Sequence, residues 1–80
     1  MNARVILSLT EELSLKSYSS REVIRMLTSD GWYIVRTKGD HHQFKHPTKK
    51  GTVTVPHPRK DIPVRTVKSI CKQAAIVIPE

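Results

Sequence analysis

Apolar residues first take a helical spacing after Ser19. Val23, Met26 and Leu27 fall on one face of a helix, with charged residues off that face. Ser19 is followed three residues later by a glutamate, which is the capping-box pattern that marks a helix start. Gly31 can take the positive φ that commonly follows a helix, so it predicts the helix end.

Three short strand patterns follow this helix. Residues 32–38 (WYIVRTK) and 52–55 (TVTV) are rich in aromatic or β-branched residues and predict the first and third strands. Residues 41–46 (HHQFKH), between two turn signals, are interpreted as the second strand. Turn signals at 39–40 (Gly-Asp) and 47–51 (PTKKG) separate them. Because the first link is tight, an antiparallel hairpin and meander is expected.

The last pattern is helical again. Pro63 suits a first helical turn, where its missing N–H costs nothing. Val67, Ile70, Cys71 and Ala74 then follow at i, i+3, i+4 and i+7. The order α-β-β-β-α predicts an α+β fold, in which two helices cover one face of a three-stranded antiparallel sheet and leave the other face open.

Alternation along the second strand assigns its side chains to these two faces. Phe44 is the large apolar residue and should point to the helices, and His42 and His46 share its parity. The open face then carries His41, Gln43 and Lys45.

Charge is distributed unevenly along the 80 residues. The chain has 14 lysines and arginines against 7 acidic residues, a net charge of +7. Residues 36–72 hold ten basic and two acidic residues, whereas residues 1–35 hold four of each. A charge excess confined to one half indicates a polyanion partner, with a solvated basic surface as the alternative.

Cysteine content and hydropathy suggest the compartment. A single cysteine, Cys71, cannot form a disulfide within the chain, which fits a reducing cytosol. No apolar run is long enough to span a bilayer, and the N-terminus is a poor signal peptide.

Residues 1–16 show no clean period and are interpreted as an extension: a short strand, a packing arm or a poorly ordered leader. A cytoplasmic protein with no membrane partner is predicted.

All four histidines lie in two basic segments, residues 38–47 and 51–63. Histidine can gain or lose a proton near neutral pH, and the surrounding cations attract an anion. RNA is a polyanion that acid–base attack can cleave. His41 is the better placed of the adjacent pair, because it points to the open face; a surface histidine without chemistry is the alternative.

The sequence gives little support for a metal site or for a reactive thiol. Neighbouring histidines point opposite ways along a strand, Cys71 lies on an apolar helix face, and no spacing matches a zinc site. Neither a metal nor a cofactor is predicted.

The combination of GWYIVRTKGDHHQFKHP, TVTVPHPRKDIP and TVKSICKQA resembles the HicA family of toxin–antitoxin systems, over roughly Tyr18 to Ala75. The resemblance implies a double-stranded-RNA-binding-domain-like fold for residues 17–80, with residues 1–16 outside it. It also implies an mRNA-cleaving toxin that a HicB antitoxin neutralises. The family usually carries Gly-Ser-His-His at the start of strand two, where the first histidine is catalytic, and His41 takes that position.

Two departures from the family pattern affect the site. Asp40 stands where the family usually has serine; its carboxylate could repel a phosphate or hold the imidazole by a hydrogen bond. Val64-Arg65-Thr66 replaces the usual Pro-x-Gly-Thr ending and adds a cation that could contact phosphate.

These observations favour metal-independent cleavage of mRNA with His41 as general acid–base. His57, between two prolines, could be a second proton donor or purely structural. Exposed cations are expected to position the RNA backbone. These candidates are Arg36, Lys38, Lys45, Lys49, Lys50, Arg59, Lys60, Arg65 and Lys68, with Lys72 further along the last helix. The competing hypotheses are a non-catalytic RNA-binding module and a subunit that only docks an antitoxin.

Overall fold

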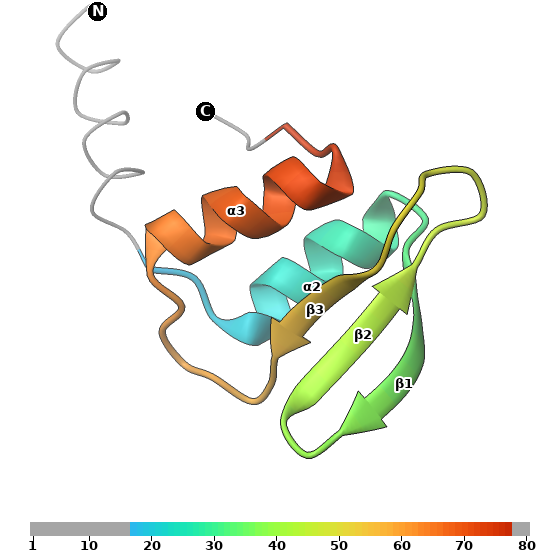
Figure 1. Ribbon diagram of the computed structural model, residues 1–80. Helices are drawn as coiled ribbons and strands as arrows, with labels where there is room; N and C mark the ends of the chain where they lie inside the picture. The colour runs from blue at the N-terminus through green and yellow to red at the C-terminus, as the bar shows by residue number, and fades with distance from the viewer. Residues whose placement is uncertain (1–16, 78–80) are drawn as a thin grey trace, which may run out of the picture.

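A computed structural model of the protein describes residues 17–77, so the expectation for residues 1–16 lies outside the described residues. The elements run in the order α2 (Ser20–Ser29), β1 (Tyr33–Lys38), β2 (His41–Lys45), β3 (Val53–Pro56) and α3 (Val64–Ala74) (Figure 1). The α-β-β-β-α order and the α+β class predicted from the sequence are confirmed.

The predicted capping box begins α2. The Glu22 backbone N–H donates to Ser19 Oγ at 3.1 Å, and the Ser19 backbone N–H donates to Glu22 Oε1 at 2.9 Å. Two donors at the helix start are therefore satisfied reciprocally. This start matters for the site, because Ser20 immediately follows the cap.

The end of α2 is a Schellman motif centred on Gly31. The Trp32 backbone N–H donates to Leu27 O at 3.0 Å, and Gly31 adopts φ +104°. A Cβ at Gly31 would also lie 2.9 Å from His46 Nε2. Both the backbone conformation and the close approach of His46 therefore require glycine here.

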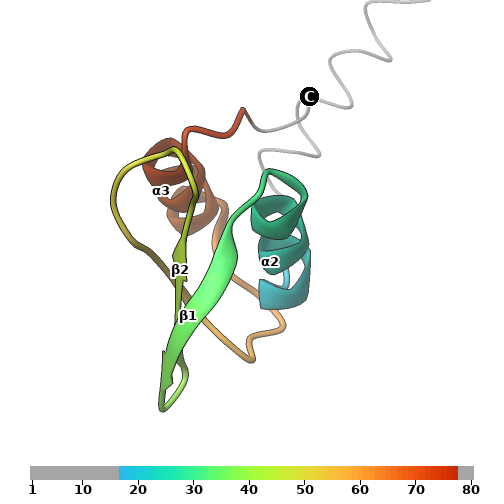
Figure 2. The same cartoon turned by 90° about the vertical axis from the view of Figure 1, so that its right-hand side faces the viewer.

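The three strands form one antiparallel sheet in the order β1-β2-β3. Phe44 in the central strand lies opposite Ile34 and Val53. Phe44, Val53 and Val55 are buried, and both helices contact β3. The face that carries these side chains is therefore the packed face. Figure 2 shows the β1–β2 hairpin extending past the helices.

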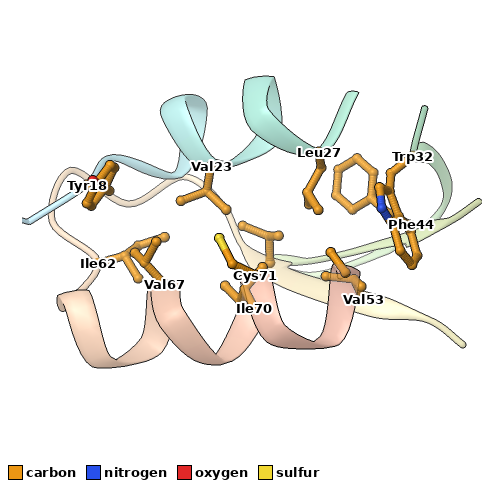
Figure 3. Packing of buried hydrophobic residues seen from close by; sticks show 12 residues of the cluster. Tyr18, Val23, Leu27, Trp32, Phe44, Val53, Ile62, Val67, Ile70 and Cys71 are labelled. Atoms are coloured by element: carbon orange, nitrogen blue, oxygen red, sulfur yellow. The ribbon is translucent and has the colours of Figure 1, made fainter. Parts of the chain in front are cut away.

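The core lies between the two helices and the packed face of the sheet (Figure 3). The apolar stripe predicted for the last helix is fully buried. Burial raises the pKa of the Cys71 thiol, which fits its place in this stripe. The buried apolar residues are Tyr18, Val23, Leu27, Trp32, Phe44, Val53, Val55, Ile62, Val67, Ile70, Cys71 and Ala74.

Strand β1 contains a β-bulge. Ile34 lies opposite Phe44 and Arg36 lies opposite Gln43, so Val35 has no partner across the hairpin. One extra residue reverses which face the following side chains take. Beyond the bulge, Lys38 therefore shares a face with His41 rather than with Phe44.

No helix among residues 17–77 is long and apolar enough to cross a membrane.

Candidate active site and nucleic-acid interface

His41 begins β2, where it pairs with Lys38 on one side and Pro56 on the other. Its side chain is 63% exposed, whereas Phe44 on the same strand is 2% exposed. As the alternation predicted, His41 faces outward and Phe44 faces the helices. The imidazole of His41 is therefore open to a ligand from solvent.

Asp40 lies beside this imidazole and is itself paired. Its Oδ1 is 3.8 Å from His41 Nε2, which is too long for a hydrogen bond. Its Oδ2 accepts a 2.8 Å hydrogen bond from Arg59 Nη2. Since the guanidinium offsets the carboxylate charge, repulsion of an approaching phosphate is reduced.

The open face of the sheet also carries several cations. Lys45 lies on the same side of β2 as His41, and the bulge brings Arg36 and Lys38 to that side from β1. All of these side chains are exposed. We call this set, made up of Arg36, Lys38, His41 and Lys45, the open-face cluster.

His42 points the opposite way and meets His57. The two ring centroids are 4.9 Å apart in an edge-to-face arrangement. His57 Nδ1 shares a 2.6 Å hydrogen bond with Ser20 Oγ of α2. Both histidines are only half-buried, whereas Ser20 is buried. The helix start thus fixes the position of His57 beside the central strand.

Ser20 also binds the backbone of the loop after β3. The Arg59 backbone N–H donates to Ser20 Oγ at 2.9 Å. The single hydroxyl hydrogen of Ser20 can go to His57 Nδ1 or to Arg59 O, which lies 3.2 Å away. If Ser20 donates to His57 Nδ1, that nitrogen is the acceptor. If Ser20 donates to Arg59 O, the other tautomer of His57 donates from Nδ1 to Ser20 Oγ. Sequence reasoning missed Ser20, because nothing in the pattern links residue 20 to residue 57.

A cleft of about 440 Å³ opens beside this hydrogen-bonded junction. Cations line it, and Arg21 among them was not a sequence-based candidate. Its lining residues are Ser19, Ser20, Arg21, His57, Pro58, Arg59 and Lys60.

His46 is held by the structure on both ring nitrogens. Its Nδ1 accepts the backbone N–H groups of Thr48 and Lys49, both at 3.1 Å. The proton therefore resides on Nε2, which donates to Asp30 O at 2.7 Å. The ring also packs edge-on against Trp32, with centroids 5.2 Å apart. His46 ties the turn after β2 to the end of α2.

Lys49, one of the cations expected to contact RNA, forms hydrogen bonds within the protein. Its ammonium donates to the Asp30 carboxylate and to the carbonyl oxygens of Ala74 and Ala75. The hydrogen bond from Lys49 holds the pKa of Asp30 below its usual range. Lys49 thus joins the C-terminal ends of both helices, and its three donors are occupied. Its neighbour Lys50 is exposed.

Arg65 and Lys68 are exposed on α3, whose opposite side packs into the core. Because α3 packs against the sheet on its packed face, this helix and its exposed cations lie on the side opposite the open-face cluster. The cations of α3 therefore form a surface separate from the open-face cluster. Arg59 and Lys60 line the cleft, and the Arg59 guanidinium also binds Asp40.

Within residues 17–77, no group of three or more histidine, cysteine or acidic side chains is arranged to hold a metal ion.

No curated protein shows significant similarity to the chain. A family model described as "HicA toxin of bacterial toxin-antitoxin" matches residues 20–76. This match spans all five elements, from the start of α2 to just past the end of α3. The chain therefore belongs to the HicA family of toxins from bacterial toxin–antitoxin systems.

Proposed function

We propose that this HicA-family toxin is a metal-independent endoribonuclease that cleaves mRNA, with His41 as its general acid–base group. The observation that carries the proposal is the exposed imidazole of His41 on a basic, outward-facing strand. Lys38 is its direct cross-strand neighbour, so a cation stands where a phosphate would approach.

The proposed reaction uses the RNA's own nucleophile. His41 accepts the proton of a ribose 2′-OH, and the 2′-oxygen attacks the adjacent phosphorus. The bond from phosphorus to the 5′-oxygen breaks, and a proton from solvent neutralises the leaving oxygen. The products are a 2′,3′-cyclic phosphate and a 5′-hydroxyl. One positioned acid–base group typically contributes ~10²–10⁴-fold to the rate.

Neighbouring groups have supporting roles in this proposal. Lys38 and the other cations of the open-face cluster stabilise the negative charge that builds up on phosphorus. Asp40, balanced by Arg59, keeps a carboxylate near His41 without presenting a bare charge to the RNA.

We assign the RNA path to the open face of the sheet. Arg36, Lys38 and Lys45 would contact the backbone beside the scissile bond, since phosphate contacts position a nucleic acid without reading its sequence. Lys50 would extend this path beyond the Lys45 end of β2, and Arg59 and Lys60 would extend it beyond the His41 end, in the loop after β3. Arg65 and Lys68 on α3 remain proposed contacts for a separate stretch of RNA.

A HicA-family toxin implies a cognate antitoxin. We propose that a HicB-like protein covers the open face and so blocks His41. We also propose that the toxin acts in the cytoplasm, where its mRNA substrate lies.

The test compares the wild-type chain with His41→Ala. Each is induced in growing cells while growth and mRNA integrity are followed, and each purified protein is assayed on RNA in EDTA. We expect only the wild type to arrest growth and to leave 2′,3′-cyclic phosphate ends, while both bind RNA alike. A His42→Ala variant is the matched control, because it removes the adjacent imidazole that faces His57.

Three outcomes would contradict the proposal. Equal cleavage by wild type and His41→Ala would remove His41 from the chemistry. Loss of wild-type activity in EDTA, restored by zinc or magnesium, would indicate a metal-dependent reaction. RNA binding without cleavage by the wild type would favour the alternative of a binding module.

A further inference from the structure

We propose that Tyr33 is a base-stacking residue of the open face, which holds an unpaired nucleotide of single-stranded RNA beside the scissile bond. The proposal rests on the proposed RNA-cleaving function and adds to it the kind of RNA that is bound. Aromatic rings that meet single-stranded bases are a recurring means of RNA recognition.

Tyr33 differs from the other aromatic residues of the chain in its exposure. Trp32 and Phe44 are 2% exposed and Tyr18 is 7% exposed, whereas Tyr33 is 50% exposed. Half of the Tyr33 side chain is thus accessible from solvent, as are its neighbours on β1. Among the four aromatic residues of the chain, Tyr33 is therefore the one whose ring can meet a ligand.

The register of the hairpin places Tyr33 on the open face. Tyr33 lies directly opposite Lys45, and paired residues of an antiparallel hairpin project to the same side. Lys45 in turn projects away from the buried Phe44. The ring of Tyr33 is therefore on the same side of the sheet as His41.

The bulge surrounds this ring with positive charge. In a regular strand Tyr33 and Arg36, three residues apart, would lie on opposite faces, but Val35 bulges out of the pairing. With this bulge, Arg36 joins Tyr33 and Lys45 on the open face. An aromatic ring flanked by cations is complementary to a base with its phosphates, which is the pattern of proteins that bind single strands.

The spacing separates the stacked base from the reacting one. His41 and Lys45 are four residues apart on β2, which corresponds to about 13 Å at the rise of a strand. A base on Tyr33 thus belongs to a nucleotide near the scissile bond rather than at it. Tyr33 should therefore contribute to binding equally in the ground and transition states, changing KM and leaving kcat unchanged.

The test measures binding of the full chain to 2′-O-methyl RNA, single-stranded or duplex. This RNA lacks the attacking hydroxyl, so its binding is independent of whether His41 is catalytic. Tyr33→Ala should weaken binding of the single strand about tenfold or more, while Tyr33→Phe should bind like the wild type. Duplex binding should not change. In cleavage assays Tyr33→Ala should raise KM with kcat unchanged.

Ile34→Ala is the matched control. Ile34 is as exposed as Tyr33, at 48%, but lies opposite Phe44 and so projects to the other face. It should bind RNA like the wild type. Equal losses for Tyr33→Ala and Ile34→Ala, or for Tyr33→Phe and Tyr33→Ala, would overturn the proposal. So would unchanged RNA affinity with weakened binding of the antitoxin, since the ring would then serve a protein partner.

Discussion

The ion pair between Arg59 and Asp40 bears directly on the histidine that we propose to be catalytic. The Asp40 carboxylate lies 3.8 Å from His41 Nε2. The guanidinium of Arg59 comes from the loop after β3 and binds the far oxygen of that carboxylate. The carboxylate of Asp40 and its balancing cation come from different loops, so only the fold brings them together.

We predict that Arg59→Ala raises the KM for RNA cleavage more in the wild-type background than in Asp40→Asn. Without the guanidinium, the carboxylate repels the substrate phosphate, whereas the amide does not. For a half-exposed pair the coupling should reach roughly fivefold at most. A double-mutant cycle measures it. Identical effects of Arg59→Ala in both backgrounds would show that the pair does not influence RNA binding.

The sequence pattern predicted side-chain positions correctly where they depended on one element alone. Alternation around Phe44 predicted that His41 faces outward, and helical spacing identified the buried stripe of α3. It did not predict the intramolecular role of Lys49, whose three acceptors come from the ends of two helices. It also missed Ser20, whose partners lie 37 and 39 residues away.

At the scale of elements, two strand boundaries differ by one residue from those predicted, because neighbouring hydrogen bonds take up the residue at the boundary. β1 begins at Tyr33 rather than Trp32, because the Trp32 N–H completes the end of α2. β2 ends at Lys45 rather than His46, whose ring binds the following turn. The bulge at Val35 could not be predicted, because every residue of β1 is exposed and no alternation of burial marks the register.

The end of α3 yields a prediction about stability. Ala75 adopts the left-handed conformation, with φ 54°, while the Ile76 N–H donates to Cys71 O at 2.9 Å. A Cβ in this conformation costs roughly 1–2 kcal/mol, part of which glycine recovers. We expect Ala75→Gly to stabilise the protein by about 1 kcal/mol and to raise Tm by roughly 4–8 °C.

Ala74→Gly is the control for this substitution. Ala74 is buried in the last helical turn, so glycine there should lower Tm instead. Thermal unfolding followed by circular dichroism measures both. A lower Tm for Ala75→Gly would show that the left-handed residue is not strained.

Considered as a whole, the molecule carries cations on both sides, but only one side contains His41. Net charge alone could not reveal this division, because residues 36–72 supply both surfaces. The order of elements separates them, because α3 packs against the face of the sheet opposite the open face and carries Arg65 and Lys68 exposed on its surface.

This division predicts how RNA binding responds to salt. The double substitution Lys38→Gln and Lys45→Gln should reduce the slope of log affinity against log salt by about 0.7 for each lost contact with a single strand. Arg65→Gln with Lys68→Gln removes the same charge from α3 and should change the slope less. Titrations of 2′-O-methyl RNA at several salt concentrations distinguish the two surfaces. A larger change for the α3 pair would move the main RNA path to that helix.

The place of Trp32 gives the protein an intrinsic optical probe. It is the only tryptophan of the chain, it is buried, and its ring contacts His46 where α2 meets the turn after β2. Its emission should therefore shift when that junction opens during unfolding. Because Trp32 is buried in the core, its fluorescence should not change when a ligand binds to the open face of the sheet. Folding and ligand binding can thus be followed in one cuvette, the first by native fluorescence and the second by a labelled ligand.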